Sequence, residues 1–314
     1  MLGHYDDVIG GHRPRSGTRR LAVISLVSVI AVAAVVGSFV ARGAQATADV
    51  SAFEGLGTWV SIYGSKAYTQ PDAVAAAIAA RGVKTVYVQT GNNSQPVDVV
   101  RPGALGLLLD ALHSAGLKVV AWYLPGFVKP AIDLRRALAA VAFRTPSGGR
   151  FDGFALDIES AAVKRVALRT SRVLALSRQL RAAAGADYAL GAIIPSPRGM
   201  ELANKYWPGF PFNGLAGIYD VLLPMDYWTF SVKGFDATYG YLARSLAILR
   251  AKVGNPDVKI HLVGGTTGDT TAAEDQAFSQ LVVDDGHLTG WSLFDYFATK
   301  PAEWPILAPP SPSG

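Results

Sequence analysis

Two carboxylates stand two residues apart near the end of an apolar run in the middle of the chain. The run reads Phe151-Asp152-Gly153-Phe154-Ala155-Leu156-Asp157-Ile158-Glu159. In a strand, successive side chains point to opposite faces, so Asp157 and Glu159 share one face and the large apolar side chains take the other. Neighbouring carboxyls shift each other's pKa, so one can keep its proton as a general acid while the other stays ionised. Cleavage of a glycosidic bond uses this chemistry.

A purely structural interpretation of the two acids requires an inward-facing Arg or Lys, because burying an unpartnered carboxylate is costly. No other predicted strand end supplies an obvious one. A second candidate group lies at the end of a later run, where Met225 and Tyr227 share a face. Tyr227 could donate a hydrogen bond into a pocket, or both side chains could only fill the core.

Aromatic rings stack on the apolar faces of sugar rings, and polar groups bind sugar hydroxyls. Such residues recur within a few positions of the predicted strand ends, which favours a sugar-binding cleft. We take as candidate substrate-binding residues Tyr63, Gln89, Trp122, Met225, Asp226, Trp228 and Trp291.

The elements that must position these residues are short apolar runs, as expected for parallel strands buried on both faces. Their starts are roughly 26–39 residues apart. The eight predicted strands are Gly57–Gly64, Val83–Gly91, Leu117–Leu124, Phe151–Glu159, Tyr188–Ile194, Tyr219–Tyr227, Val258–Gly264 and Leu288–Tyr296.

Helical segments separate most of these strands, often with Pro near the start or Gly just past the end. The clear ones are Pro71–Arg81, Pro102–Ala115, Ser160–Ala184, Tyr239–Val253 and Thr271–Leu281, whereas Met200–Gly217 reads as a long loop. This alternation predicts an α/β fold, a (β/α)8 TIM barrel, with its active site at the carboxyl ends of the strands. A doubly wound sheet would normally carry a glycine-rich loop after its first strand, and Tyr63-Gly64-Ser65-Lys66 is no such loop.

The first 40 residues predict a membrane-directed segment. Leu21 to Val40 carries no charge and is long enough to span about 30 Å as a helix. Four of the five Arg in residues 1–46 precede it, which predicts residues 1–20 in the cytoplasm and everything after about residue 41 outside. The segment is therefore either an anchor of a single-pass protein of the cell membrane or a secretory signal cleaved after Ala46.

The remaining organisation follows from these assignments. We expect a linker over 41–56, the barrel over 57–300 and an irregular Pro-rich tail over 301–314.

The chain has 314 residues and a net charge of +5, of which residues 1–46 contribute +3. The barrel is thus nearly neutral, and we expect no nucleic-acid partner. There is no Cys, and the five His show no metal-binding spacing, so we expect no metal. We also expect no cofactor, and we expect the protein to be a monomer.

The run from Phe151 to Glu159 resembles the strand-four motif of glycoside hydrolase family 18, the chitinases and endo-β-N-acetylglucosaminidases. That motif is Asp-Gly-x-Asp-x-Asp-x-Glu, and Met225-x-Tyr227 is similar to the family's Met-x-Tyr on strand six. Trp291 resembles the Trp that floors the sugar subsite of the family. The resemblance implies that Glu159 is the proton donor, that Asp157 orients the 2-acetamido group of the substrate, and that Tyr227 binds its carbonyl oxygen, which acts as the nucleophile.

One position departs from this motif: the family's middle Asp is Ala155 here. Asp157 therefore lacks the neighbour with which it would share a proton. Two alternatives stay open beside an exported hydrolase of N-acetylhexosamine-containing glycans. One is a glycan-binding protein of the same fold without catalysis. The other is a muramidase acting on peptidoglycan, because Asp157-Ile158-Glu159 also resembles the strand-four Asp-x-Glu of glycoside hydrolase family 25.

Overall fold

A computed structural model describes residues 48–266 and 269–308, and the structural statements below concern these residues. The predicted segment Leu21–Val40 lies outside them, so its prediction as an anchor or signal is not tested by the structure. Within the described ranges, no helix is both long enough and apolar enough to cross a membrane.

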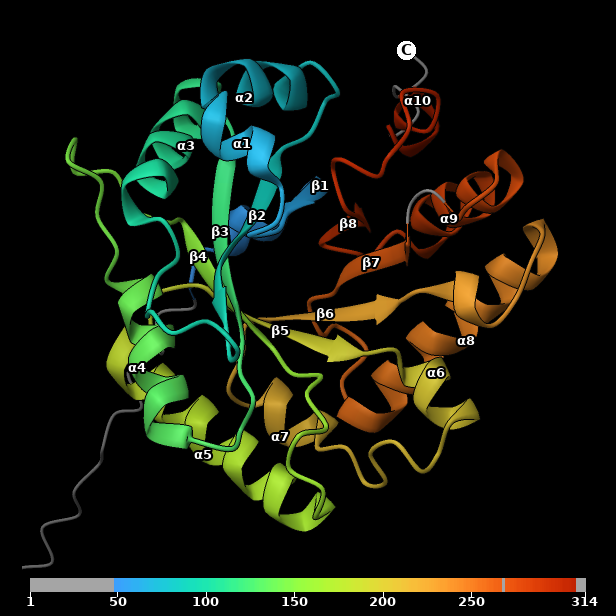
Figure 1. Ribbon diagram of the computed structural model, residues 1–314. Helices are drawn as coiled ribbons and strands as arrows, with labels where there is room; N and C mark the ends of the chain where they lie inside the picture. The colour runs from blue at the N-terminus through green and yellow to red at the C-terminus, as the bar shows by residue number, and fades with distance from the viewer. Residues whose placement is uncertain (1–47, 267–268, 309–314) are drawn as a thin grey trace, which may run out of the picture. The chain divides into compact units, whose positions relative to one another are not determined.

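Eight parallel strands pair in sequence order, and the last strand pairs with the first, which closes the ring (Figure 1). The strands are β1 (Gly55–Val60), β2 (Thr85–Asn92), β3 (Lys118–Leu124), β4 (Gly153–Asp157), β5 (Leu190–Pro195), β6 (Val221–Asp226), β7 (His261–Thr266) and β8 (Gly290–Phe294). Each predicted apolar run overlaps one of them, although β1, β2, β5 and β7 extend one or two residues beyond the predicted bounds, and the predicted closed (β/α)8 barrel is confirmed.

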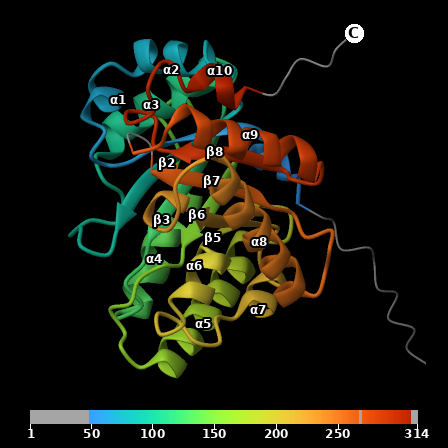
Figure 2. The same cartoon turned by 90° about the vertical axis from the view of Figure 1, so that its right-hand side faces the viewer.

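The helices surround the barrel, and α8 and α9 lie side by side on its outside in both views (Figure 2). The helices are α1 (Ser65–Thr69), α2 (Pro71–Ala79), α3 (Pro102–Ser114), α4 (Pro130–Val141), α5 (Val166–Ala184), α6 (Pro197–Leu202), α7 (Phe212–Ala216), α8 (Phe235–Val253), α9 (Ala272–Asp285) and α10 (Trp304–Leu307). Two short 3-10 helices, η1 (Val50–Phe53) and η2 (Trp228–Phe230), complete the set.

Several predicted element boundaries are wrong. The helix predicted from Ser160 begins at Val166, because residues 158–165 form an irregular connection after β4. The stretch predicted as one long loop contains α7, and the predicted irregular tail contains α10, whose Trp304 and Leu307 are buried against the core. Helix α4 is an additional element that the sequence analysis did not identify.

The amino-terminal end of the barrel is closed by Phe53 of η1, which is fully buried. Its ring lies 6.1 Å from the ring of Tyr87. Glycines on the surrounding strands make room for it: a Cβ added at Gly153 would lie 3.2 Å from the Phe53 ring, and one at Gly191 would lie 2.7 Å from it. The segment before β1 therefore acts as a plug inside the barrel.

A buried polar chain lies above this plug. The Trp59 indole N–H donates to the Ser292 hydroxyl at 2.8 Å, and that hydroxyl lies 2.9 Å from His261 Nε2. The other ring nitrogen of His261 donates to the Phe53 carbonyl at 2.9 Å. Burial lowers the pKa of His261 to about 4, so the ring is neutral, and the assigned tautomer carries its proton on Nδ1.

Gly290 at the start of β8 is the position where this packing leaves least room. A Cβ added there would lie 2.7 Å from the Gly55 carbonyl oxygen, and closer still to the Phe53 carbonyl and the His261 ring. We expect Gly290→Ala to lower the free energy of unfolding by about 1–3 kcal/mol, the usual cost of overpacking, because two of these contacts are with backbone. Denaturant unfolding measures the change.

The matched control is Gly240→Ala on the exposed side of α8, where an added Cβ meets nothing within 4 Å. There the substitution should raise stability by up to ~1 kcal/mol through helix propensity. Equal effects of the two substitutions would contradict the close packing around Gly290.

Candidate active site

Strand β4 carries the two candidate acids to the carboxyl end of the barrel. Phe154, Leu156 and Ile158 pack into the apolar layer outside the strands, whereas Ala155 packs into the barrel interior. Asp157, the last residue of the strand, is on the inward side and only 6% exposed. Glu159 follows two residues after the strand ends and is half-buried.

The two acids share an environment that disfavours their charged forms. Burial raises the pKa of Asp157 well above its usual value, and the negative charge of Glu159 raises it further. Burial also raises the pKa of Glu159. Neither acid forms an ion pair with any residue of the described chain, and one carboxyl oxygen of Asp157 is buried without a hydrogen-bond partner. The pair therefore holds a proton to higher pH than an isolated carboxyl would.

Tyr227 is close enough to the two acids for their charges to affect its pKa. Burial raises its pKa well above 10, and the charges of Asp157, Glu159 and Asp295 raise it further. Its phenol therefore stays protonated and can donate a hydrogen bond. The structure thus brings together the three residues predicted to be catalytic and adds a third carboxyl, Asp295, directly after β8.

The burial of Asp157 has a consequence for stability. Because folding raises the pKa of Asp157 above its unfolded value of ~3.9, the carboxylate destabilises the fold once the pH exceeds that value, increasingly so up to the folded pKa. We expect Asp157→Asn to stabilise the protein at pH 7, because the amide carries no charge to bury. At pH 3 the gain should vanish. Thermal unfolding at both pH values measures it, and a loss of stability at pH 7 would contradict it.

Trp122 of β3 occupies the barrel interior on the strand that neighbours β4. It pairs in register with Ala155 on the neighbouring strand, and its ring lies 5.9 Å from that of Trp59. Its indole N–H is buried and has no hydrogen-bond partner. A donor without an acceptor thus lies across from the position where the resembling family has Asp.

Tyr63 and Gln89 lie at the carboxyl end of the barrel with the acids, but they differ in how accessible their side chains are to a ligand. Tyr63, in the connection after β1, is 72% exposed, and its hydroxyl accepts a hydrogen bond from the Asn92 amide at 3.4 Å. Gln89 is buried, and its side-chain oxygen accepts from the Ile62 backbone N–H at 3.1 Å. Tyr63 is therefore free to contact a ligand, whereas the Gln89 oxygen is already used to fix a loop.

The candidate substrate-binding residues at the end of strand β6 lie on both the inner and the outer face of the barrel wall. Met225 packs against the interior cluster, on the same side as Tyr227. Asp226 points outward, is fully buried, and accepts hydrogen bonds from the Ser196 and Ser245 hydroxyls at 2.5 Å each. Burial raises its pKa to about 6.

Trp228 is also fully buried, with its ring 5.5 Å from that of Phe278 in the outer layer. A side chain without exposed surface has no contact with a sugar. The predicted substrate contacts of Asp226 and Trp228 are therefore corrected to structural roles between the barrel and its helices.

The prediction for Trp291 also needs correction. Ser292 faces inward, so Trp291 faces outward, where its indole N–H donates to the Leu307 carbonyl of α10 at 2.9 Å. The inward aromatic residue of β8 is Phe294, whose ring lies 6.2 Å from Tyr227 and 6.1 Å from Trp59. The signal for Phe294 was its position near the carboxyl end of the predicted strand, where a barrel has its site, and not its residue type.

Tyr206 is a site residue that the sequence analysis missed. It lies between α6 and α7, and its hydroxyl donates to the Glu159 backbone carbonyl. Burial raises its pKa to about 12, and the charges of Glu159 and Asp157 contribute to this shift. Nothing in the local sequence indicates this contact, because it depends on how a long connection folds back over the barrel.

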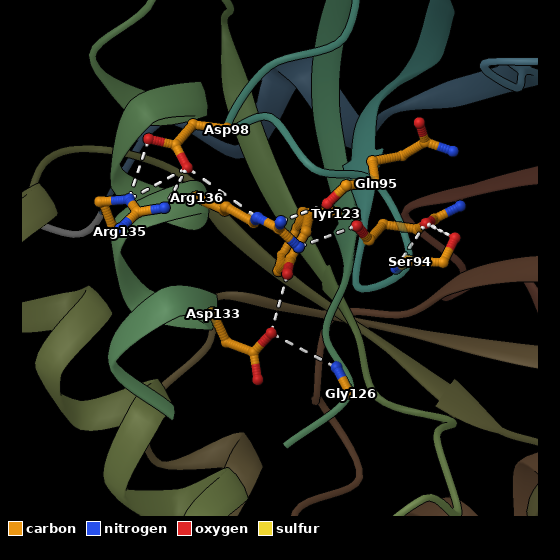
Figure 3. A network of polar contacts seen from close by, with 9 residues as sticks. Ser94, Gln95, Asp98, Tyr123, Gly126, Asp133, Arg135 and Arg136 are labelled. Atoms are coloured by element: carbon orange, nitrogen blue, oxygen red, sulfur yellow. Dashed lines mark hydrogen bonds and ion pairs between the residues drawn. The ribbon is translucent and has the colours of Figure 1, made fainter. Parts of the chain in front are cut away.

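A polar network fixes the connection after β2 beside the site (Figure 3). Arg136 of α4 is buried and donates to the backbone carbonyls of Asn92, at 3.1 Å, and of Gln95. Arg135 forms an ion pair with Asp98 at 2.9 Å. Helix α4 therefore holds the 92–98 segment through charged donors.

Asp133, on the same helix, fixes the connection after β3. Its carboxylate accepts from the Tyr123 hydroxyl at 2.8 Å and from the Phe127 backbone N–H at 2.9 Å (Figure 3 shows the Tyr123 bond). Phe127 has a φ of 59°, a left-handed conformation that is uncommon for a non-glycine residue. The carboxylate of Asp133 helps to hold it there.

The described residues contain no group of three or more His, Asp or Glu side chains arranged to hold a metal ion.

The chain matches no protein-family model and no curated protein sequence. Solved structures share its fold. The spore cortex-lytic enzyme SleL of Bacillus cereus has a TM-score of 0.58 at 9% identity, over 81% of this chain and 73% of that one. A chitinase from Chromobacterium violaceum has 0.54 at 15% identity, over 81% and 98%. An endo-β-1,4-mannanase from Thermotoga petrophila has 0.58 at 12% identity, over 77% and 67%. The structures similar to this chain thus include TIM-barrel glycoside hydrolases, and at these identities the likeness establishes the fold.

Proposed function

We propose that the protein is a glycoside hydrolase of the family 18 type that cleaves glycans containing N-acetylhexosamine. The observation that carries the proposal is the buried carboxyl of Asp157, with one unpartnered oxygen, beside Glu159 and Tyr227 at the carboxyl end of the barrel. Natural proteins seldom bury such a group without a partner, and a bound ligand with a polar hydrogen would supply one.

In the proposed mechanism, Glu159 donates its proton to the glycosidic oxygen as the bond to the anomeric carbon breaks. The carbonyl oxygen of the substrate's own 2-acetamido group bonds to that carbon and forms a bicyclic ion. Asp157 accepts a hydrogen bond from the acetamido N–H, and Tyr227 donates one to the carbonyl oxygen. Glu159 then removes a proton from the water that opens the ion, which restores the acid.

The proposal includes the location and partners of the barrel. We propose that it lies outside the cytoplasm, tethered to the membrane by residues 21–40 or released after Ala46, and that it acts as a monomer. The support is the uncharged segment and the Arg residues that precede it. Protease added to intact cells should degrade the barrel, and complete protection in cells with a permeable outer layer would reject this orientation.

A test of the function incubates the full-length chain in detergent separately with chitin oligomers and with purified peptidoglycan, and identifies the products by mass spectrometry. We expect release of shorter glycans from at least one of them. If the protein neither bound nor cleaved either glycan, the proposal would be rejected.

A second candidate, a glycan-binding protein without catalysis, is favoured by one observation. Ala155 lies where the resembling motif has Asp, and the Trp122 indole N–H across from it has no acceptor. Binding of an oligosaccharide without any cleavage would establish this alternative.

A further inference from the structure

The main chain at Glu159 is not held by regular secondary structure. Strand β4 ends at Asp157, and the next helix, α5, begins at Val166. The Ile158 backbone N–H still donates to the Ile193 carbonyl at 2.8 Å. At Glu159 itself, the hydrogen bond to the backbone carbonyl comes from the Tyr206 side chain.

The segment that carries Tyr206 is fixed in turn by α5. The Arg169 guanidinium donates to the Tyr206 backbone carbonyl at 2.6 Å and lies 4.0 Å from the centre of the Trp207 ring. Arg169 is only 2% exposed. The Trp207 indole N–H donates to the Thr170 hydroxyl at 2.9 Å. A buried cation stacked on an aromatic face and bonded to a carbonyl makes a stiff attachment.

The same turns of α5 also hold the neighbouring connection after β3. Arg172 donates to the Phe127 carbonyl at 2.8 Å, and the Phe127 ring lies 6.5 Å from that of Trp207. Arg169 and Arg172 thus tie together backbone segments that border the site.

We propose that Tyr206, held by Arg169 and Trp207, is a positioning residue that fixes the main chain of Glu159 and thereby the reach of its carboxyl. The inference deepens the proposed function and rests on it, because Glu159 is its proton donor. A general acid must lie within about 2.6–3.2 Å of the oxygen it protonates, and a misplacement of 1 Å can cost about 100-fold in rate.

The test compares Tyr206→Phe with Tyr188→Phe in the full-length chain. Tyr188 is a matched control because its hydroxyl also donates to a backbone carbonyl, that of Phe151, at 3.3 Å and at the opposite end of β4. On a cleaved oligosaccharide, we expect Tyr206→Phe to lower kcat about 10-fold and to change KM less than about threefold. In the pH profile of kcat for Tyr206→Phe, the alkaline limb should move to lower pH. A less confined Glu159 is better hydrated, and hydration favours its charged form. Tyr188→Phe should change neither.

A second readout does not need turnover. The chain contains five Glu, so carboxyl carbons labelled with ¹³C can be titrated by NMR, with the Glu159 signal identified by its loss in Glu159→Gln. We expect Tyr206→Phe to lower the pKa of Glu159 and Tyr188→Phe to leave it unchanged. Arg169→Lys keeps the positive charge but loses the planar guanidinium, so it should also lower the pKa of Glu159, by less than Tyr206→Phe does.

These readouts separate the two proposals. If the wild-type protein cleaves no glycan, the proposed function fails, and the titration alone then decides the positioning role. An unchanged pKa of Glu159 in both Tyr206→Phe and Arg169→Lys, each still folded, would overturn it. An equal loss of kcat in the Tyr206 and Tyr188 variants would also overturn it, because a general loss of rigidity would then explain both.

Discussion

If Glu159 is the proton donor, we expect Glu159→Gln to lower the turnover of a cleavable oligosaccharide by about 100-fold or more and to leave the affinity for that oligosaccharide nearly unchanged. General acid–base groups contribute about 10²–10⁴-fold to rate, and an amide keeps the size and hydrogen-bonding capacity of the carboxyl but has no acidic proton. Single-turnover kinetics and equilibrium binding, measured on the same protein, separate the two effects.

Glu54→Gln is the matched control for this experiment. Glu54 is an exposed glutamate in the connection between η1 and β1, at the opposite end of the barrel. Its substitution should leave turnover unchanged. Wild-type turnover in Glu159→Gln would remove Glu159 from the proton-donor role. A loss of affinity equal to the loss of rate would assign it to substrate binding instead.

The second large effect concerns the substrate itself. If the acetamido carbonyl is the nucleophile, removing the acetyl group from the sugar that donates the bond should lower turnover by at least about 100-fold. The physical reason is that a well-placed intramolecular group can have an effective molarity of about 10⁵–10⁸ M, which solvent water cannot replace. Matched acetylated and de-acetylated oligosaccharides, compared at saturating concentration, measure the loss in kcat.

Two further observations distinguish this route from attack by an enzyme carboxylate or by water. The product should keep its anomeric configuration, because the acetamido oxygen and then water each invert it. A thiazoline that mimics the bicyclic ion should bind much more tightly than the substrate, as analogues of high-energy species do. Inverted product, or equal cleavage of de-acetylated chains, would show that Asp157 has another role.

The strands were predictable because their sequences carry a strong local signal. Parallel strands are buried on both faces, so each appears as an apolar run, and the alternation within β4 placed Asp157 on the inward side. Helix α4 shows why such reasoning fails elsewhere. Two of its buried positions are Asp133 and Arg136, whose partners lie in the connections after β2 and β3. Its buried face thus combines apolar residues with two charged ones, and a charged residue in a sequence does not indicate burial.

The errors at the site have a related cause. Strand β8 turns Ser292 inward to meet Trp59 and His261, and so it turns Trp291 outward. Asp226 points outward because hydroxyls from distant segments satisfy it there. In each case the partner that decides the side of the barrel lies far away in sequence. Residue type alone does not decide the side, although the alternation that turns Met225 and Tyr227 inward already turns Asp226 outward.

Closure of the ring between β1 and β8 also determines when the barrel interior can form. The Trp59–Ser292 bond joins residues 233 positions apart, and the His261–Phe53 bond joins residues 208 positions apart. Contacts of such high sequence separation are slow to form, because the entropy of closing the chain must be lost before they stabilise anything. During synthesis, the segment with Asp157 and Glu159 emerges well before β8. The enclosed interior beneath the acids is therefore one of the last features to assemble, and a chain that ends before β8 never acquires it.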